Sequence, residues 1–271
     1  EPVLDLLDGI RVAGAQTFVR PVKEHRFLLV LRPEEATDAD IEDTDPGVTG
    51  VAPLDVVAGS PSSDRAARIA REWLARVPET LSGQPRANMV LLRGFATLPD
   101  WPLFTDVFRM RSLAMAAYPM YRGVARLVGM DAVAVDDDPG ALLPALEERI
   151  DDYDFFFLHV KGTDKAGEDG DFRQKVDIIE RVDEVLPALR ETGIGVTLIT
   201  GDHSTPAKMK SHSWHPVPFL LHGGPGRGHR SEGTAGLGES ECARGALGTI
   251  RGCELMPLAA ARAGRLGKFG A

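Results

Sequence analysis

The feature that most constrains the fold is a regular alternation of short apolar runs with longer helical patterns after about residue 108. The apolar runs are RSLAMA, DAVAV, YDFFFLHV, GVTLIT and VPFLLHG. The stretches between them, such as MYRGVARLVG, PGALLPALEERI and FRQKVDIIERVDEVLPALRET, have the spacing and length of helices. Short apolar strands that alternate with helices are typical of a parallel sheet covered on both faces. Residues 108–271 are therefore predicted to form an α/β domain with a mostly parallel sheet and helices on both faces.

Residues 1–107 have a different pattern. HRFLLVLR and ANMVLLRGF (87–95) are short apolar runs that predict strands. SPSSDRAARIAREWLARVPETL predicts an amphipathic helix that Ser62 or Ser63 caps. Its inward positions are expected to be mostly Ala67, Ile69, Trp73, Leu74 and Val77. Because 271 residues exceed one average domain, we expect a smaller α+β domain at 1–107 before the α/β domain at 108–271.

Charge and composition exclude several classes of function. The formal net charge is -9 at pH 7, and no basic stripe is present to replace phosphate counterions, so we expect no nucleic-acid partner. No run of 18 apolar residues occurs, so we expect no membrane span. Cys242 and Cys253 form no C-x-x-C pair and are too few for a disulfide framework. A reducing, cytoplasmic location is therefore expected.

Carboxylates and imidazoles gather in the segments that follow or precede three of the predicted strands. KGTDKAGEDGD follows YDFFFLHV, GDHSTP follows GVTLIT, and SHSWHP stands just before VPFLL. In chain order these segments carry Lys161, Asp164, Glu168, Asp169, Asp171, Asp202, His203, His212 and His215. Ligands of open parallel sheets bind beyond the carboxyl ends of the strands. We therefore expect these side chains to meet at one edge of the sheet.

The residue types in these segments are those of a metal site. Mixed carboxylate and imidazole ligands without thiolate suit Mn²⁺ or Zn²⁺. Asp202 and His203 are adjacent, and neighbouring side chains diverge on an extended backbone, so they are better placed to serve two metals than to share one. Two-metal sites stabilise both the attacking and the leaving oxygen atoms of an in-line displacement at phosphorus. The pattern therefore indicates two divalent metal ions, Mn or Zn, and phosphoryl chemistry.

Each candidate also has an ordinary structural explanation. Asp164 and Glu168 lie four residues apart and share one face if the segment winds into a helical turn, but such a pair is most often a solvated helix face. His203 alone is more often a loop histidine with satisfied hydrogen bonds. The set taken together is stronger evidence for a site than any of its members.

Longer stretches of the chain resemble a known family. VKGTDKAGEDGDF, TGDHSTP and HSWHPVP occur in that order, and IEDTDP (41–46), ANMVLLRG (87–94), GVARLVGM (123–130) and ESECARGALG (239–248) accompany them. Together they resemble the archaeal-type 2,3-bisphosphoglycerate-independent phosphoglycerate mutases of the alkaline phosphatase superfamily. The resemblance implies an alkaline-phosphatase-like α/β domain at 108–271. It also implies that 1–107 are the C-terminal part of an inserted domain that helps to bind phosphoglycerate.

The resemblance implies a role for the acidic and histidine candidates. Asp164 and His212 match ligands of one metal, and Asp202 and His203 match ligands of the other. Glu168 stands where the family pattern commonly has histidine, and a glutamate can still bind Mn²⁺ or Zn²⁺ through oxygen.

Two basic residues also match family positions. Lys161 and Arg93 are expected to bind the phosphate or the carboxylate of the substrate, Arg through two parallel hydrogen bonds and Lys through a point contact. The alternative is that both are surface cations without a substrate role.

The implied activity is interconversion of 3-phosphoglycerate and 2-phosphoglycerate through a phosphoserine. No segment here matches the family's N-terminal part with its nucleophilic serine, and Ser204, beside the ligands, is interpreted as a loop hydroxyl. We therefore expect the chain to be the C-terminal part of a longer enzyme and to be inactive alone. The alternatives are a phosphatase or another phosphomutase of the same superfamily, or a catalytically dead metal-binding fragment.

Overall fold

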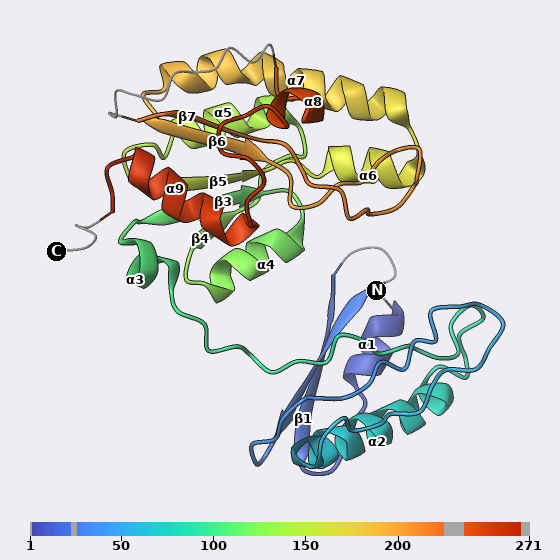
Figure 1. The fold of residues 1–271 in the computed structure, drawn as a ribbon. Helices are drawn as coiled ribbons and strands as arrows, with labels where there is room; N and C mark the ends of the chain where they lie inside the picture. Colours follow the sequence, from blue (N-terminus) through green and yellow to red (C-terminus); the bar gives the residue numbers. More distant parts are fainter. Residues whose placement is uncertain (1, 23–25, 225–235, 267–271) are drawn as a thin grey trace. The chain divides into compact units, whose positions relative to one another are not determined.

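The computed structural model describes residues 2–22, 26–224 and 236–266. The chain divides into two compact units, Glu1–Asp100 and Trp101–Ala271, which are described separately. The division falls within LPDWP, and in Figure 1 the first unit runs from blue to cyan and the second from green to red. No helix among the described residues is long and apolar enough to cross a membrane.

The first unit packs a long helix against a two-stranded antiparallel sheet. Its elements in chain order are α1 (Pro2–Asp8), β1 (Ala15–Pro21), β2 (Phe27–Pro33), the 3-10 turn η1 (Pro61–Ser63) and α2 (Asp64–Thr80). β1 and β2 pair with Phe18 opposite Val30. Trp73 of α2 is fully buried, and its ring lies 6.5 Å from that of Phe27 on β2. The predicted inward face of α2 is confirmed, since the buried positions include Ala67, Ile69, Trp73, Leu74 and Val77.

Two expectations for this unit were wrong in detail. Ser63 occupies the N-cap position of α2, but its side chain does not cap the helix, because its hydroxyl accepts a hydrogen bond from the Asp40 backbone N–H at 3.0 Å. Residues 87–95 form no strand among the described residues. Their backbone groups are satisfied by an irregular loop instead: Leu92 exchanges hydrogen bonds with Thr44, and the Gly94 N–H donates to Asp43 Oδ1 at 2.8 Å. Because its partner is a loop and not a strand, this segment cannot form the repeated hydrogen bonds of a β-sheet.

The second unit has the α/β pattern that the sequence predicted. Its first elements are α3 (Phe104–Phe108), β3 (Ser112–Ala116), α4 (Pro119–Leu127), β4 (Asp131–Val133), α5 (Pro139–Glu147) and β5 (Phe155–His159). They are followed by α6 (Gly162–Asp169), α7 (Phe172–Glu191), β6 (Val196–Thr200), β7 (Phe219–Gly223), α8 (Glu239–Cys242), the 3-10 turn η2 (Gly252–Glu254) and α9 (Leu255–Arg262). Every apolar run predicted as a strand after residue 108 is a strand.

The direction of each strand follows from its connection. β3, β4 and β5 are parallel, as predicted. The structure places them in the order β4, β3, β5, and helices connect them. β6 and β7 pair antiparallel, with Leu198 opposite Leu221. The segment 201–218 between these two strands contains no helix, so the chain returns directly instead of crossing over. The same loop carries the histidine-rich sequence, so its reversal holds that sequence at one end of β6.

The central strand β3 is buried on both faces. Leu113 and Met115 pack with Leu142, Leu146 and other apolar residues of α5 and α7. Ala114 points the opposite way and packs with Ala125 of α4. In Figure 1, α5 and α7 accordingly lie on one side of the strands and α4 on the other. This alternation fixes the register of β3, and with it the position of the loop that follows its carboxyl end.

Truncating the core of β3 tests this packing. We expect Leu113→Ala to lower the free energy of unfolding by roughly 2–5 kcal/mol, because a fully buried leucine leaves a cavity between β3 and the helices. Urea denaturation followed by circular dichroism measures the loss. Leu247→Ala, the same change at a side chain 45% exposed, is the control and is expected to cost less than about 0.5 kcal/mol. Equal losses in the two variants would contradict the packing described.

A carboxylate joins the beginnings of β3 and β5. Asp154 Oδ2 accepts hydrogen bonds from the Arg111 backbone N–H at 3.0 Å and from Nε at 3.1 Å, and Arg265 donates to Oδ1 at 3.0 Å. The hydrogen bonds from the Arg111 side chain and backbone lower the pKa of Asp154 to about 2, against the opposing effect of burial. Asp154 is therefore ionised in the folded protein at any pH near neutrality.

The lowered pKa predicts how stability depends on pH. An unfolded aspartate titrates near a pKa of about 3.9, so the stabilisation from Asp154 is complete above about pH 4 and is lost as the pH falls toward 2. The difference in unfolding free energy between wild type and Asp154→Asn is expected to be larger at about pH 5 than at about pH 3. Urea titrations at both pH values measure it. Asp151→Asn, an exposed neighbour, is the control, and a difference independent of pH would refute the proposed linkage.

Candidate metal centre

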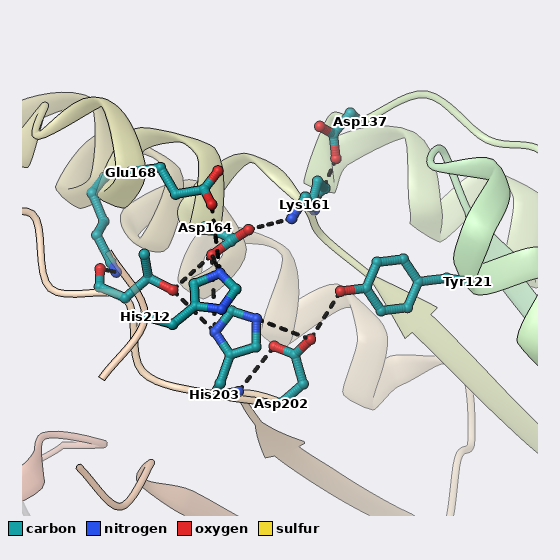
Figure 2. Close-up of polar contacts among 10 residues, drawn as sticks. Tyr121, Asp137, Lys161, Asp164, Glu168, Asp202, His203 and His212 are labelled. Atoms are coloured by element: carbon teal, nitrogen blue, oxygen red, sulfur yellow. Dashed lines mark hydrogen bonds and ion pairs between the residues drawn. The ribbon is translucent and has the colours of Figure 1, made fainter. Parts of the chain in front are cut away.

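The polar candidates of the second unit meet where β3, β5 and β6 end. Asp164 and Glu168 lie on α6, which begins shortly after β5. Asp202 and His203 follow β6 directly, and His212 lies in the loop between β6 and β7. Figure 2 shows their side chains converging from these segments on one place. The sequence expected this convergence at the carboxyl edge of the sheet.

Helix α6 presents two of its carboxylates to the same histidine. Asp164 and Glu168 are one helical turn apart, and Nε2 of His212 lies 3.5 Å from Asp164 Oδ1 and 3.5 Å from Glu168 Oε1. Asp164 is the more enclosed of the two, with 13% of its side chain exposed against 52% for Glu168. The helical turn on which the sequence argument depended is therefore present, and its carboxylate face points at the histidines.

Three ligand atoms lie close enough to share one ion. Asp164, His203 and His212 each offer an atom within 4.8 Å of the others. The two imidazole rings lie with centroids 3.8 Å apart, and His203 Nδ1 is 3.9 Å from Asp164 Oδ1. One carboxylate and two imidazoles form a ligand set of the kind that binds Zn²⁺ and related divalent ions. The donor chemistry of these three residues therefore fits a divalent metal.

A second pair of ligand atoms stands beside the first group. Nε2 of His203 lies 3.6 Å from Asp202 Oδ2. The hydroxyl of Tyr121 donates to the same Oδ2 at 2.8 Å, and its ring stacks on His159 with centroids 3.6 Å apart. Sequence reasoning missed Tyr121. It lies on α4 just after β3, and its position beyond the carboxyl end of the central strand is the sequence signal that points to it.

The electrostatics keep both aspartates ionised. Burial alone would raise the pKa of Asp164, but hydrogen bonds from Lys161 and Thr205 and the charge of Lys161 outweigh it and lower that pKa. The same balance lowers the pKa of Asp202, where burial is opposed by the Tyr121 hydrogen bond and the charge of His203. Burial and the hydrogen bond to Asp202 raise the pKa of Tyr121, so it remains a donor.

The basic candidates are placed differently. The Lys161 ammonium pairs with Asp164, and its backbone N–H donates to Asp137 Oδ1 at 3.0 Å, so Lys161 belongs to the cluster (Figure 2). Arg93 belongs to the first unit, is 63% exposed and lies 3.8 Å from Asp45. His215, the remaining histidine of the loop, stacks on Trp214 and contacts Ser213 Oγ at 2.9 Å. It is not part of the three-residue group.

Removing one hydroxyl tests the contact to Asp202. We expect Tyr121→Phe to raise the pKa of Asp202 in the metal-free protein, because the lost hydrogen bond favours the ionised carboxyl. Carboxyl ¹³C chemical shifts followed through an acid titration measure this pKa. Tyr153→Phe removes an equivalent bond, from its hydroxyl to Asp131 Oδ2 at 2.9 Å, and is expected to leave Asp202 unchanged. An unchanged pKa of Asp202 in Tyr121→Phe would disprove the hydrogen bond between the two residues.

Comparison with known proteins gives a consistent family. Residues 38–262 match the Metalloenzyme superfamily. The chain is 44% identical over 270 residues to a probable 2,3-bisphosphoglycerate-independent phosphoglycerate mutase of Deinococcus radiodurans, covering 98% of this chain and 64% of the relative. It is 45% identical over 264 residues to a protein of the same description from Thermus thermophilus, covering 96% of this chain and 64% of the relative. The chain thus spans less than two thirds of the length of these relatives.

Solved structures resemble the whole chain. A protein from Pyrococcus horikoshii superimposes with a TM-score of 0.80 at 30% identity, covering 100% of this chain and 70% of that one. A cofactor-independent phosphoglycerate mutase from Thermoplasma acidophilum superimposes with a TM-score of 0.65 at 22% identity, covering 97% of this chain and 69% of that one. The second likeness concerns the fold alone. Together with the family match, these likenesses confirm the alkaline-phosphatase-like α/β fold that the sequence predicted.

Proposed function

Because this chain belongs to the Metalloenzyme superfamily, we propose that the protein is a phosphoglycerate mutase that interconverts 3-phosphoglycerate and 2-phosphoglycerate through a phosphoserine. The observation that carries the proposal is the convergence of Asp164, Asp202, His203 and His212 from three chain segments. The relatives described as probable mutases support the choice of substrate.

We propose that the cluster holds two divalent ions, Mn²⁺ or Zn²⁺. Asp164 and His212 are the ligands proposed for one ion, with Glu168 beside them, and Asp202 and His203 are those proposed for the other. The distance of 3.6 Å between Asp202 Oδ2 and His203 Nε2 supports their sharing an ion, although they are adjacent in sequence. When bound, such ions neutralise the charge on the oxygens of a phosphoryl group in transfer.

The chain's own residues supply orientation and further charge. Lys161 places an ammonium group beside Asp164, which supports a contact with the phosphate or carboxylate of the substrate. The Tyr121 hydroxyl donates to Asp202 Oδ2 and the His203 backbone N–H donates to Asp202 Oδ1 at 3.1 Å, so both oxygens of this carboxylate keep a defined direction. In this proposal the first unit is part of the substrate-binding domain and Arg93 a second anion contact. A cytoplasmic location is proposed because the chain has only two cysteines, too few for a disulfide framework.

The serine that accepts the phosphoryl group is proposed to come from a segment outside residues 1–271. Ser204 follows the ligands directly, but its backbone is bridged to Ser213, whose N–H donates to Ser204 O at 2.8 Å. This bridge supports a role for Ser204 in closing the loop between β6 and β7. It gives no support to a role as the nucleophile.

Enzyme assays on the product of the complete gene test the proposal. With 3-phosphoglycerate and Mn²⁺ or Zn²⁺, we expect ³¹P NMR to show 2-phosphoglycerate and little free phosphate. His203→Ala and His212→Ala are each expected to lower kcat/KM roughly 100-fold or more, because each removes a proposed ligand. His215→Ala, in the same loop but outside the cluster, is the matched control and is expected to retain activity.

The same assay separates the competing functions. Release of free phosphate without 2-phosphoglycerate would indicate a phosphatase of the same superfamily. Isomerisation of a different phosphate ester, with 3-phosphoglycerate left unchanged, would indicate another phosphomutase. Metal binding without turnover of any phosphate ester would indicate a catalytically inactive metal-binding protein. Full activity in His203→Ala would contradict the metal roles proposed here.

A further inference from the structure

A buried hydroxyl joins two of the proposed ligands. Thr205 is 3% exposed, and its Oγ1 donates to Asp164 Oδ1 at 2.6 Å. The same Oγ1 lies 3.0 Å from Nδ1 of His203. Asp164 comes from α6 and His203 from the loop after β6, so this one atom connects α6 to that loop.

The single hydrogen on Thr205 Oγ1 determines which ring nitrogen of His203 carries a proton. A threonine hydroxyl has one hydrogen and two lone pairs, and an ionised carboxylate can only accept. The hydrogen of Oγ1 is therefore used in the bond to Asp164, and the contact with His203 needs a hydrogen on Nδ1. A neutral imidazole protonated on Nδ1 has its free lone pair on Nε2. Nε2 is the atom that lies 3.6 Å from Asp202 Oδ2, where a second ion is proposed.

The backbone of Thr205 is held as firmly as its side chain. Nζ of Lys175, on α7, donates to the Thr205 carbonyl oxygen at 2.6 Å. Gly167 of α6 approaches so closely that a Cβ there would lie 2.3 Å from the same oxygen. Only a residue without a side chain permits this approach. Both α6 and α7 therefore fix the place from which the hydroxyl acts.

From this arrangement we infer that Thr205 is the positioning residue of the metal centre: it orients the Asp164 carboxylate and holds His203 in the tautomer whose Nε2 is free to bind metal. The inference rests on the proposed metal-ligand roles. Groups of this kind, which bind the second nitrogen of a ligating histidine, commonly change metal affinity 10–100-fold when removed.

The tautomer of His203 gives a readout that needs neither metal nor activity. In metal-free protein labelled with ¹⁵N-histidine at about pH 8, above the ordinary histidine pKa of about 6.5, long-range ¹H–¹⁵N spectra distinguish the two tautomers. His203 is expected to carry its proton on Nδ1 in the wild type and to lose that preference in Thr205→Val. Thr205→Ser keeps the hydroxyl and is expected to restore the wild-type tautomer.

Metal affinity is the second readout. Calorimetric titration with Zn²⁺ or Mn²⁺ is expected to show binding roughly 10–100-fold weaker in Thr205→Val and close to wild type in Thr205→Ser. Thr44→Val is the matched control, because Thr44 is 1% exposed and its hydroxyl also makes two hydrogen bonds, both with the backbone of Leu92 in the first unit. That variant is expected to lose stability but to bind metal normally.

The outcomes separate this inference from the proposed function. An Nδ1-protonated His203 and unchanged metal affinity in Thr205→Val would overturn the role of Thr205. Equal weakening in Thr205→Val and Thr44→Val would also overturn it, because the effect would then be general destabilisation. A wild-type protein that binds no divalent ion would instead contradict the proposed function, while the tautomer spectra still decide what Thr205 does to His203.

Discussion

The concentration of negative charge at the carboxyl end of the strands is the constraint on which the centre depends. Asp164, Glu168 and Asp202 gather within reach of the same two imidazoles, and Asp164 is largely removed from solvent. Partly buried carboxylates are stable only when hydrogen bonds and positive charges replace the lost water. Here a lysine, two hydroxyl groups and the histidines replace the lost water. A divalent cation would add positive charge beside the same carboxylates.

The fold supplies these partners from separate layers. Tyr121 belongs to α4, Lys161 stands between β5 and α6, and Thr205 lies in the loop after β6. The packing of each segment holds its side chain in place. Because β3 is buried on both faces, its position fixes where α4 begins. The geometry of the centre is thus a consequence of how the helices pack on the sheet. The hydrogen bonds then select the direction of each carboxylate and imidazole.

The local sequence pattern was sufficient to predict a helix or strand where the spacing of its apolar residues shows which face packs against the core. The strands and helices after residue 108 are examples, as is the apolar face of α2. It was insufficient where the partner lies elsewhere. Residues 87–95 have the composition of a strand but pair with the loop at Thr44, and Ser63 has the position of a cap but its hydroxyl binds Asp40. Both departures arise because a distant backbone group competes for the same hydrogen bond.

The sequence alone determined which residue types follow or precede which strands, and from the expectation of a parallel sheet it predicted that Asp164, Asp202, His203 and His212 would converge. In the structure β6, which precedes Asp202 and His203, pairs antiparallel with β7. Only the tertiary structure decided which of their atoms face one another. The hydroxyls of Tyr121 and Thr205 come from segments far from their acceptors in sequence, 81 and 41 residues away, and no local pattern records such contacts. Those contacts arise when packed helices and strands bring side chains together, so their direction and their effect on His203 belong to the folded molecule.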